Sequence, residues 1–419
     1  MTPLYLLTLT GCIGYYFLGF KPIFSHLEKR ILMMKPKNFT SKPLLLLYAC
    51  AVIIFIIAYL WAKPVSQQPH PVTDYAEYET GKVTMILSDS TETDSNSENS
   101  YRGEQLLIVE VTSGQYKGES LQVSNYVGPL YSVPLKVGDS AVVLISTYGD
   151  GTHTGTVYEY NRFLPLVIVF CLFFLITGLV GGKTGVKSLI GLGITIAALF
   201  YILLPALMKG APTLPTTFLV CAYITVVALA ILGGLQKKTI CAMLGTISGT
   251  ALAMIFALIA QALLRIDGMR IENAEALLQL QQTGTPIGIR GLLVAGVIVS
   301  ALGAVMDVAM SIASALTEVY TANPSLTRKD LIRSGMTIGQ DMVGTMTNTL
   351  ILALLGSSFV LIIYLYSLEL STTQLLSSSY MSLEVISSIS SSAGVILAVP
   401  VTVLITAFAL TYKQENYTK

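Results

Sequence analysis

The sequence is poor in charge. Only 12% of its 419 residues are Asp, Glu, Lys or Arg, whereas about 25% is typical of soluble domains. The 25 basic and 24 acidic residues leave a formal net charge of +1. No basic field is present to attract a polyanion, so we expect no nucleic acid among the partners.

Cysteine and histidine are also scarce. All five cysteines lie in apolar stretches and none in the long polar segment, so no disulfide framework is indicated. The three histidines, His26, His70 and His153, are isolated in polar stretches, with no partner at a metal-binding spacing. We therefore expect no metal and no cofactor.

Catalytic motifs are missing as well. The chain lacks the zinc motif HExxH, the Gly-x-Gly-Asp phrase of intramembrane aspartyl proteases and a phosphate-binding glycine loop. Asp307 and Asp341 could be imagined as a protease pair, but we expect about 16 Å of helical rise between their depths. Two carboxylates must nearly touch to share a proton. We therefore predict that the protein is not an enzyme.

Long apolar runs, by contrast, are abundant. Hydrophobic residues make up 53% of the chain, and runs of about 18 or more are candidates to cross a bilayer. The predicted fold class is an α-helical polytopic membrane protein with about nine transmembrane helices and a small all-β extracytoplasmic, barrel-like domain. The nine spans are placed near 4–20, 43–62, 163–181, 188–208, 215–234, 239–263, 291–319, 343–367 and 393–412.

The basic residues orient these spans. Fifteen of the 25 Lys and Arg fall in connections that alternate to one side, and only four in the short loops opposite. Because basic loops stay in the cytoplasm, the N-terminus is predicted outside, the C-terminus inside, and residues 63–162 outside. The chain then has three parts: two spans with a basic cytoplasmic loop (1–62), the outer domain (63–162) and seven spans (163–419).

The outer domain alternates polar and apolar residues as strands do. Five strands separated by turn signals suit a small OB-like or SH3-like barrel. They are predicted at 81–87, 104–113, 119–127, 139–146 and 154–160. The acidic, Ser-rich insert 88–100 is expected to be a mobile loop. No aromatic and basic face is evident, which favours a scaffold or docking domain for an envelope protein.

A polar stripe runs along the stretch 296–319. At about 100° per residue its small and polar residues fall within about 80° of arc, and apolar residues fill the rest. The stripe rises about 33 Å, close to the hydrocarbon thickness of about 30 Å, so Asp307 at its middle falls near the midplane. A carboxylate there costs several kcal/mol unless it faces protein, water or a partner charge. The stripe consists of Gly296, Ser300, Gly303, Asp307, Ser311, Ser314 and Glu318.

A second polar face is predicted within residues 335–356, where Asp341, Thr345 and Asn348 fall within about 60° of arc. The connection to the first stripe lies inside, so the two helices run antiparallel. Asp341 is then expected near Glu318 in depth, with Thr345 and Asn348 deeper. If the stripes face each other they form one strip. Its candidate binding residues are Asp307, Ser311, Ser314, Glu318, Asp341, Thr345 and Asn348.

The side chains of this strip fit two roles. Carboxylate, hydroxyl and amide oxygens suit Na⁺, Mg²⁺, a proton or a hydrogen-bonding substrate. Stripes of Ser, Thr and Gly also simply pack helices together. Near the interface, water, Lys329 or Arg333 could satisfy the acids. Packing is the favoured role for the glycines at 178, 181, 182, 185, 245, 249, 335 and 339.

Two long phrases, AVMDVAMSIASALTEV and SGMTIGQDMVGTMTNTLILALLG, resemble the YibE/F-like family of bacterial multispanning membrane proteins. The outer phrases SGQYKGESLQV and LKVGDSAVVL are similar to the family too. The resemblance implies a bacterial inner-membrane protein without a secure biochemical activity. Its motif acids correspond to Asp307, Glu318 and Asp341, with Thr345 and Asn348 beside them.

Two functions compete. The first is a transporter or permease that moves an ion or small molecule along the strip, with proton or cation linkage. The second is a non-transport assembly, sensing or partner-docking protein that binds an envelope protein through the outer domain. In both cases the lipid bilayer is a partner.

Overall fold

The computed structural model describes residues 52–53, 55–59, 76–94, 100–147, 153–266, 274–282 and 284–415. The predicted span 4–20 and the basic loop 21–42 lie outside them. The chain forms two compact units. The first contains Ala62–Pro212 and Glu275–Gly288, and the second contains Thr213–Ala274, Ile289–Lys419 and the N-terminal residues.

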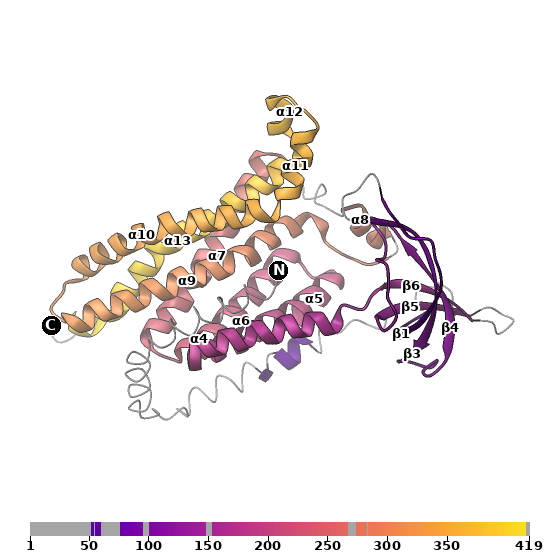
Figure 1. Ribbon diagram of the computed structural model, residues 1–419. Coiled ribbons are helices and arrows are strands. Elements are labelled where there is room, and N and C mark those ends of the chain that lie inside the picture. Colours follow the sequence, from indigo (N-terminus) through magenta and orange to yellow (C-terminus); the bar gives the residue numbers. More distant parts are fainter. Residues whose placement is uncertain are drawn as a thin grey trace, which may run out of the picture. The chain divides into compact units, whose positions relative to one another are not determined.

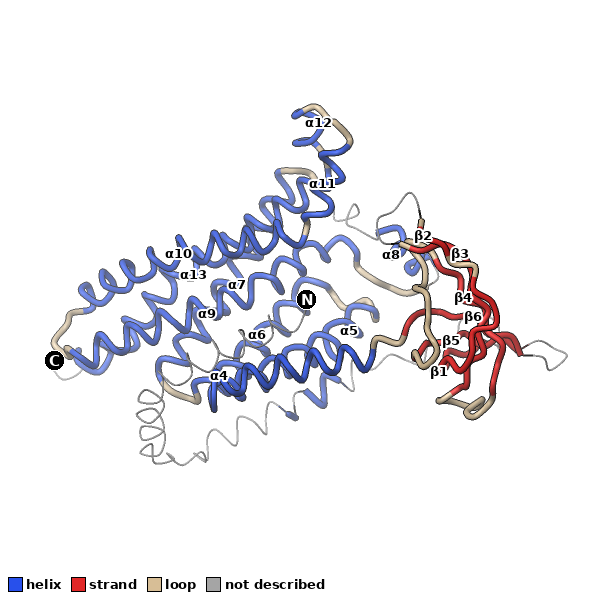
Figure 2. Tube along the Cα trace, in the orientation of Figure 1, coloured by secondary structure: helices blue, strands red, loops and turns tan. Residues whose placement is uncertain are grey.

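Five long strands of the first unit close into a ring. Each predicted strand is found: β1 (Ala76–Asp89), β3 (Tyr101–Val111), β4 (Ser120–Val127), β5 (Ser140–Thr147) and β6 (His153–Tyr160). The order β1-β5-β6-β4-β3 is closed by pairing of β3 with β1, and only the β4–β6 contact is parallel. The prediction of a small β-barrel is confirmed, and Figure 2 shows its strands together.

The barrel core alternates along the strands. Val143 and Ile145 of β5 and Leu107 and Val109 of β3 point inward and are at most 1% exposed. Such period-two burial is the pattern from which the strands were predicted. The core is therefore built from the inward faces of the five strands.

One buried polar pair fixes a loop to this core. The Gln105 side chain accepts a hydrogen bond from the Leu135 amide (2.8 Å) and donates one to the Leu135 carbonyl (3.2 Å). The Asn125 amide donates to the Gln105 oxygen (2.9 Å) and to the Val133 carbonyl (3.0 Å). Gln105 and Asn125 are 1% and 0% exposed, so nearby water does not replace these bonds.

The expectation of a wholly mobile insert over 88–100 was wrong. Strand β1 extends to Asp89, and the short strand β2 (Glu92–Thr93) pairs with the start of β3. Asp94 also forms an ion pair with Arg102 at 3.2 Å. Composition missed this order because the described ends of the insert are held by pairing with β3 and by hydrogen bonds from Thr91 to the Asp89 carboxylate, at 2.9 and 2.6 Å.

The barrel joins the first helix that follows it through a very short connection. Two residues, Asn161 and Arg162, separate β6 from α4 (Phe163–Ala198). The Asn161 amide and side chain both donate to Ser140 of β5, at 2.9 and 3.2 Å. The Asn161 oxygen accepts the Phe163 amide (3.0 Å), so the helix start is tied to the barrel wall.

Helix α4 contains a sharp turn at Gly182. This residue has φ 53 and ψ −137, a backbone conformation that favours glycine. An added Cβ on Gly185 would lie 2.3 Å from the Thr177 carbonyl oxygen, although eight residues of straight helix would rise about 12 Å. The chain therefore turns back here, as predicted for spans 163–181 and 188–208. The π-helix η1 (Leu199–Leu203) and α5 (Leu204–Met208) follow, and α8 (Ala274–Gln282) belongs to the same unit.

The second unit is helical. It contains α6 (Thr213–Gly233), α7 (Lys237–Leu263), the short η2 (Ile289–Gly291), α9 (Leu292–Ala322), α10 (Arg328–Ser357), α11 (Phe359–Ser367), α12 (Thr372–Ser377) and α13 (Ser379–Glu415). Helices α7, α9 and α13 pack against one another, α10 lies on α9 and α13, and α6 lies on α7 and α9. Figure 1 shows α7, α9, α10 and α13 side by side.

Glycines allow the helices of this unit to pack closely against one another. An added Cβ on Gly249 of α7 would lie 2.6 Å from the Ala398 Cβ of α13 and 2.7 Å from Val305 Cγ1 of α9. An added Cβ on Gly245 of α7 would likewise lie 2.2 Å from the Thr402 Oγ1 of α13. The packing role predicted for the pairs 245/249 and 335/339 is thereby confirmed, whereas 178 and 181 have open space around them.

Five helices are long and apolar enough to cross a membrane, or six if α10 and α11 count as one bent span. The prediction of about nine helices is not confirmed by this number, which covers the described residues alone. The continuous span expected at 343–367 was wrong, because the chain bends by 61° between α10 and α11. The last span is longer than the predicted 393–412, since α13 begins at Ser379.

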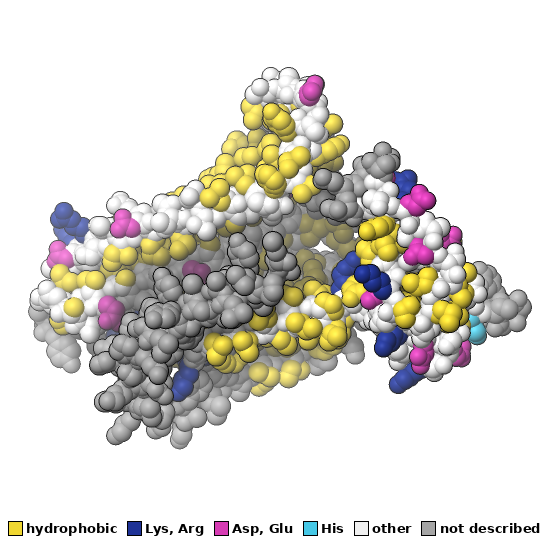
Figure 3. All heavy atoms as spheres, in the orientation of Figure 1, with side chains coloured by type: hydrophobic (Ala, Val, Ile, Leu, Met, Phe, Trp, Pro, Cys, Tyr) yellow, Lys and Arg dark blue, Asp and Glu magenta, His cyan; other side chains and the backbone are white. Residues whose placement is uncertain are grey.

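Apolar side chains cover the outer surfaces of several helices. None of the most hydropathic 18-residue window of Phe163–Met208 is buried in the structure. Figure 3 shows hydrophobic side chains gathered over α4 and over α11. Such surfaces suit lipid, and together the apolar helices indicate a multi-pass membrane protein.

Candidate functional site

The polar stripe lies on one exposed face of α9. Its members are exposed except Ser314, which is half-buried. The opposite face is apolar and packs into the bundle core. Its completely buried residues include Val294, Ala301, Val305, Val308, Ile312 and Leu316. This helix therefore buries its apolar residues and exposes its polar ones, the arrangement expected of an amphipathic helix that meets water or polar protein on one side.

Asp307 occupies the centre of this face. It lies at the midpoint of α9, equally far from Leu292 and Ala322. Within the described chain its carboxylate makes no ion pair and no hydrogen bond. About 10 residues of helix on either side are needed to span a hydrocarbon core. If α9 crosses a membrane, its midpoint is therefore where an uncompensated charge is most costly.

Helix α10 begins at a well-defined cap. The Thr327 side chain accepts the Asp330 amide, and the Asp330 carboxylate accepts the Thr327 amide at 3.1 Å, which forms a capping box. Leu331, Gly335 and Gly339 then form a buried face. This cap and this face keep the polar first half of α10 helical.

The register between α9 and α10 follows from the two glycines. Gly335 meets Leu316, and Gly339 lies beside Ile312. Continuing two residues further along antiparallel helices, from Gly339 and Ile312, places Asp341 level with Met310. The expectation that Asp341 lies near Glu318 was wrong, because the helix was assumed to begin near 343 rather than at Arg328.

This register changes the depths of the acids. Asp341 lies about three residues from the level of Asp307, or about 4.5 Å of helical rise. The 16 Å separation used against a carboxylate pair therefore does not hold, although no contact joins the two acids in the described structure. Glu318 instead lies level with Arg333.

The α10 residues are exposed but not joined to the α9 stripe. Asp341, Thr345 and Asn348 are all exposed. The Thr345 hydroxyl donates to backbone carbonyls of its own helix, at 3.2 Å to Met342. No hydrogen bond links these residues to the α9 stripe in the described part of the chain. Both polar faces therefore reach the same depth without forming one hydrogen-bonded strip.

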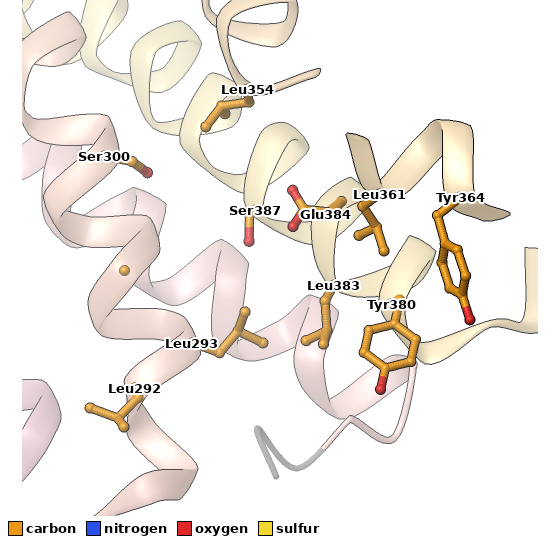
Figure 4. A pocket seen from close by; sticks show the side chains of 11 residues that line it. Leu292, Leu293, Ser300, Leu354, Leu361, Tyr364, Tyr380, Leu383, Glu384 and Ser387 are labelled. Carbon is orange, nitrogen blue, oxygen red and sulfur yellow. The ribbon is translucent and has the colours of Figure 1, made fainter. Parts of the chain in front are cut away.

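A cavity of about 600 Å³ was not predicted from the sequence. It is lined by the first turns of α9, the end of α10, α11 and the start of α13, and its one acidic lining residue is Glu384. Figure 4 shows this residue beside Ser387 and Leu361. The available signal in the sequence is Glu384 within the serine-rich stretch 367–392. The bend that brings α11 to the cavity cannot be detected from hydropathy.

The described residues contain no group of three or more His, Cys, Asp or Glu that could hold a metal. In the comparisons, the model for YibE/F-like protein matches residues 169–412, and the model for the YibE/F family N-terminal domain matches residues 74–160. No curated protein and no solved structure matches the chain. The two family models cover the helical part and the barrel, so the chain belongs to the YibE/F-like family.

Proposed function

We propose that this protein is a transporter or permease whose pathway runs along the exposed polar face of α9. The observation that carries the proposal is Asp307, an exposed acid at the midpoint of a membrane helix without a partner in the described chain. Exposed to hydrocarbon, its carboxylate would cost several kcal/mol. Contact with water or with a transported cation removes that cost.

The remaining stripe extends this polar surface. Ser300 and Ser311 lie on the same face as Asp307, and Gly296 and Gly303 leave open space above the backbone. Hydroxyl and carboxylate oxygens bind protons, water and hard cations. We therefore propose proton- or cation-linked transport, with Asp307 as the group that binds and releases the cation.

The test is a flux measurement in proteoliposomes with protons, Na⁺, Mg²⁺ and small metabolites. Asp307→Asn is expected to lower the rate at least about tenfold, because the amide carries no charge to bind or release. Asp307→Glu, which keeps the carboxylate, should retain measurable flux. Glu369→Gln removes an exposed acid outside the stripe and serves as the control. Equal flux for the wild type and Asp307→Asn contradicts the proposal.

A second candidate function is partner docking by the barrel. Tyr78 and Tyr158 are 59% and 62% exposed and stack edge to face at 5.0 Å. Leu130 and Tyr131, in the loop between β4 and β5, are also exposed. Exposed tyrosines are frequent in protein interfaces, which supports an envelope protein as partner. In that case the protein without its barrel should fail to restore function in cells that lack the protein, and the Asp307→Asn variant should restore it.

A further inference from the structure

The cavity between α9, α11 and α13 continues the polar face of α9. Gly296 and Ser300 belong to the stripe and also line the cavity. Its volume of about 600 Å³ falls within the range of about 300–1,000 Å³ found for small-molecule sites. The stripe on which Asp307 lies therefore ends in a space large enough for an organic molecule.

Most of the cavity wall is apolar. Leucines from α9, α10, α11 and α13 line it, and Leu293 and Leu383 are less than 9% exposed. Figure 4 shows these two side chains pointing toward each other across the gap between their helices. They belong to a small apolar cluster with Ile266 and Ile386. A ligand that fills this space must itself carry an apolar group.

Glu384 supplies the only charge in the cavity lining. Its carboxylate is half-buried and accepts a hydrogen bond from the Ser358 hydroxyl, at the bend between α10 and α11. No ion pair to it occurs among the described residues. In Figure 4 the carboxylate points toward Ser387 and the space next to Ser300. A half-buried carboxylate in an apolar wall favours a ligand that brings a positive charge.

Two tyrosines complete the lining. Tyr364 and Tyr380 are 58% and 52% exposed, and Figure 4 shows their hydroxyls pointing away from Ser300 and Glu384. Tyrosine faces attract organic cations, and their hydroxyls tolerate water. The tyrosines thus stand at the open side of the cavity, and the acid stands within it.

We propose that this cavity binds an amphipathic organic cation, with its amine at Glu384 and Ser387 and its apolar group among the leucines. The inference rests on the proposed function, since it names the class of cargo that enters the α9 pathway. Glu384 and Ser387, both on α13, share one helix face three residues apart, so both can contact the same amine.

The test measures binding of tryptamine to the full-length protein in nanodiscs. Tryptophol and indole-3-propionate have a similar indole body but carry a neutral alcohol and a carboxylate. Tryptamine is expected to bind at least tenfold more tightly than either. Glu384→Gln should remove this preference, since the amide keeps the bond from Ser358 but loses the charge. Glu369→Gln is the matched control on an exposed acid.

A second variant tests the cavity without touching the acid. An added Cβ on Gly296 has nothing within 4 Å, so Gly296→Leu should fold normally and fill the space. It is expected to lower the binding of tryptamine and tryptophol alike. Equal binding of all three indoles would show an apolar gap for lipid tails and overturn the proposal. Tryptamine binding that survives both variants would show a site elsewhere and also overturn it. Absence of tryptamine binding to folded protein overturns it as well.

Failure of this inference can be told from failure of the proposed function. Asp307→Asn should lower flux at least about tenfold and leave tryptamine binding intact, because Asp307 does not line the cavity. Ion flux that depends on Asp307, without tryptamine binding, refutes the cargo alone. Tryptamine binding without any flux refutes the transport function alone.

Discussion

Gly249→Val is expected to prevent accumulation of folded protein. A valine Cβ at this position would lie 2.6 Å from the Ala398 Cβ and 3.3 Å from its backbone Cα. The same atom would clash with Val305 of α9, so it cannot be accommodated by the movement of one flexible side chain. Overpacking a core usually costs about 1–3 kcal/mol, and more when backbones must separate. We expect aggregation in detergent by size-exclusion chromatography, or a clearly lowered midpoint in a thermal unfolding measurement.

The matched control is Gly303→Val on α9. An added Cβ on Gly303 has no neighbour within 4 Å, yet the substitution is the same and the position is also within a membrane helix. Its chromatographic profile should match the wild type. Comparable loss for both variants would mean that valine itself, rather than the α7–α9–α13 contact, is responsible.

Gln105→Leu is expected to destabilise the barrel. The substitution leaves the buried Leu135 amide without its acceptor and removes the oxygen that binds Asn125. Each buried polar group left unsatisfied costs about 1–3 kcal/mol, against a total stability of about 5–15 kcal/mol for a domain. Hydrogen exchange of the full-length protein should show lost protection in β3 and β4 and in the loop 128–138.

Gln122→Leu provides the control for this prediction. Gln122 lies on the neighbouring strand β4 but is exposed, so the change removes no buried hydrogen bond. Exchange in the helices should be unaffected by either variant. Unchanged protection of the loop in Gln105→Leu would show that apolar packing, not the polar pair, holds it to the barrel.

The strands and helices could be predicted from the sequence more accurately than the contacts between them. The barrel strands followed from alternation, as in β5, where Ala141, Val143 and Ile145 are buried and the residues between them are not. The spans followed from the length of their apolar runs. Helix α10 was placed poorly because its first half is polar. Its helical state depends on the Thr327 cap and on Gly335 and Gly339 against α9 and α13, which a hydropathy average cannot detect.

The candidate site was predictable only in part. The face of α9 that carries Asp307 follows from helical periodicity alone. The depth of Asp341 and the cavity at Glu384 do not, because both depend on how separate helices meet. Glu384 enters the cavity wall since α13 begins at Ser379 and the chain bends at Ser358. No periodicity within one helix contains that information.

The junction between β6 and α4 couples the barrel mechanically to the first half of α4. Asn161 clamps the helix start to β5 through Ser140, and no flexible residue separates strand from helix. A torque on the barrel is therefore transmitted to Phe163 and along the helix. This coupling ends at Gly182, where the helix is broken and the chain turns back. A force applied outside the membrane by a protein bound to the barrel would thus act mechanically on a membrane helix.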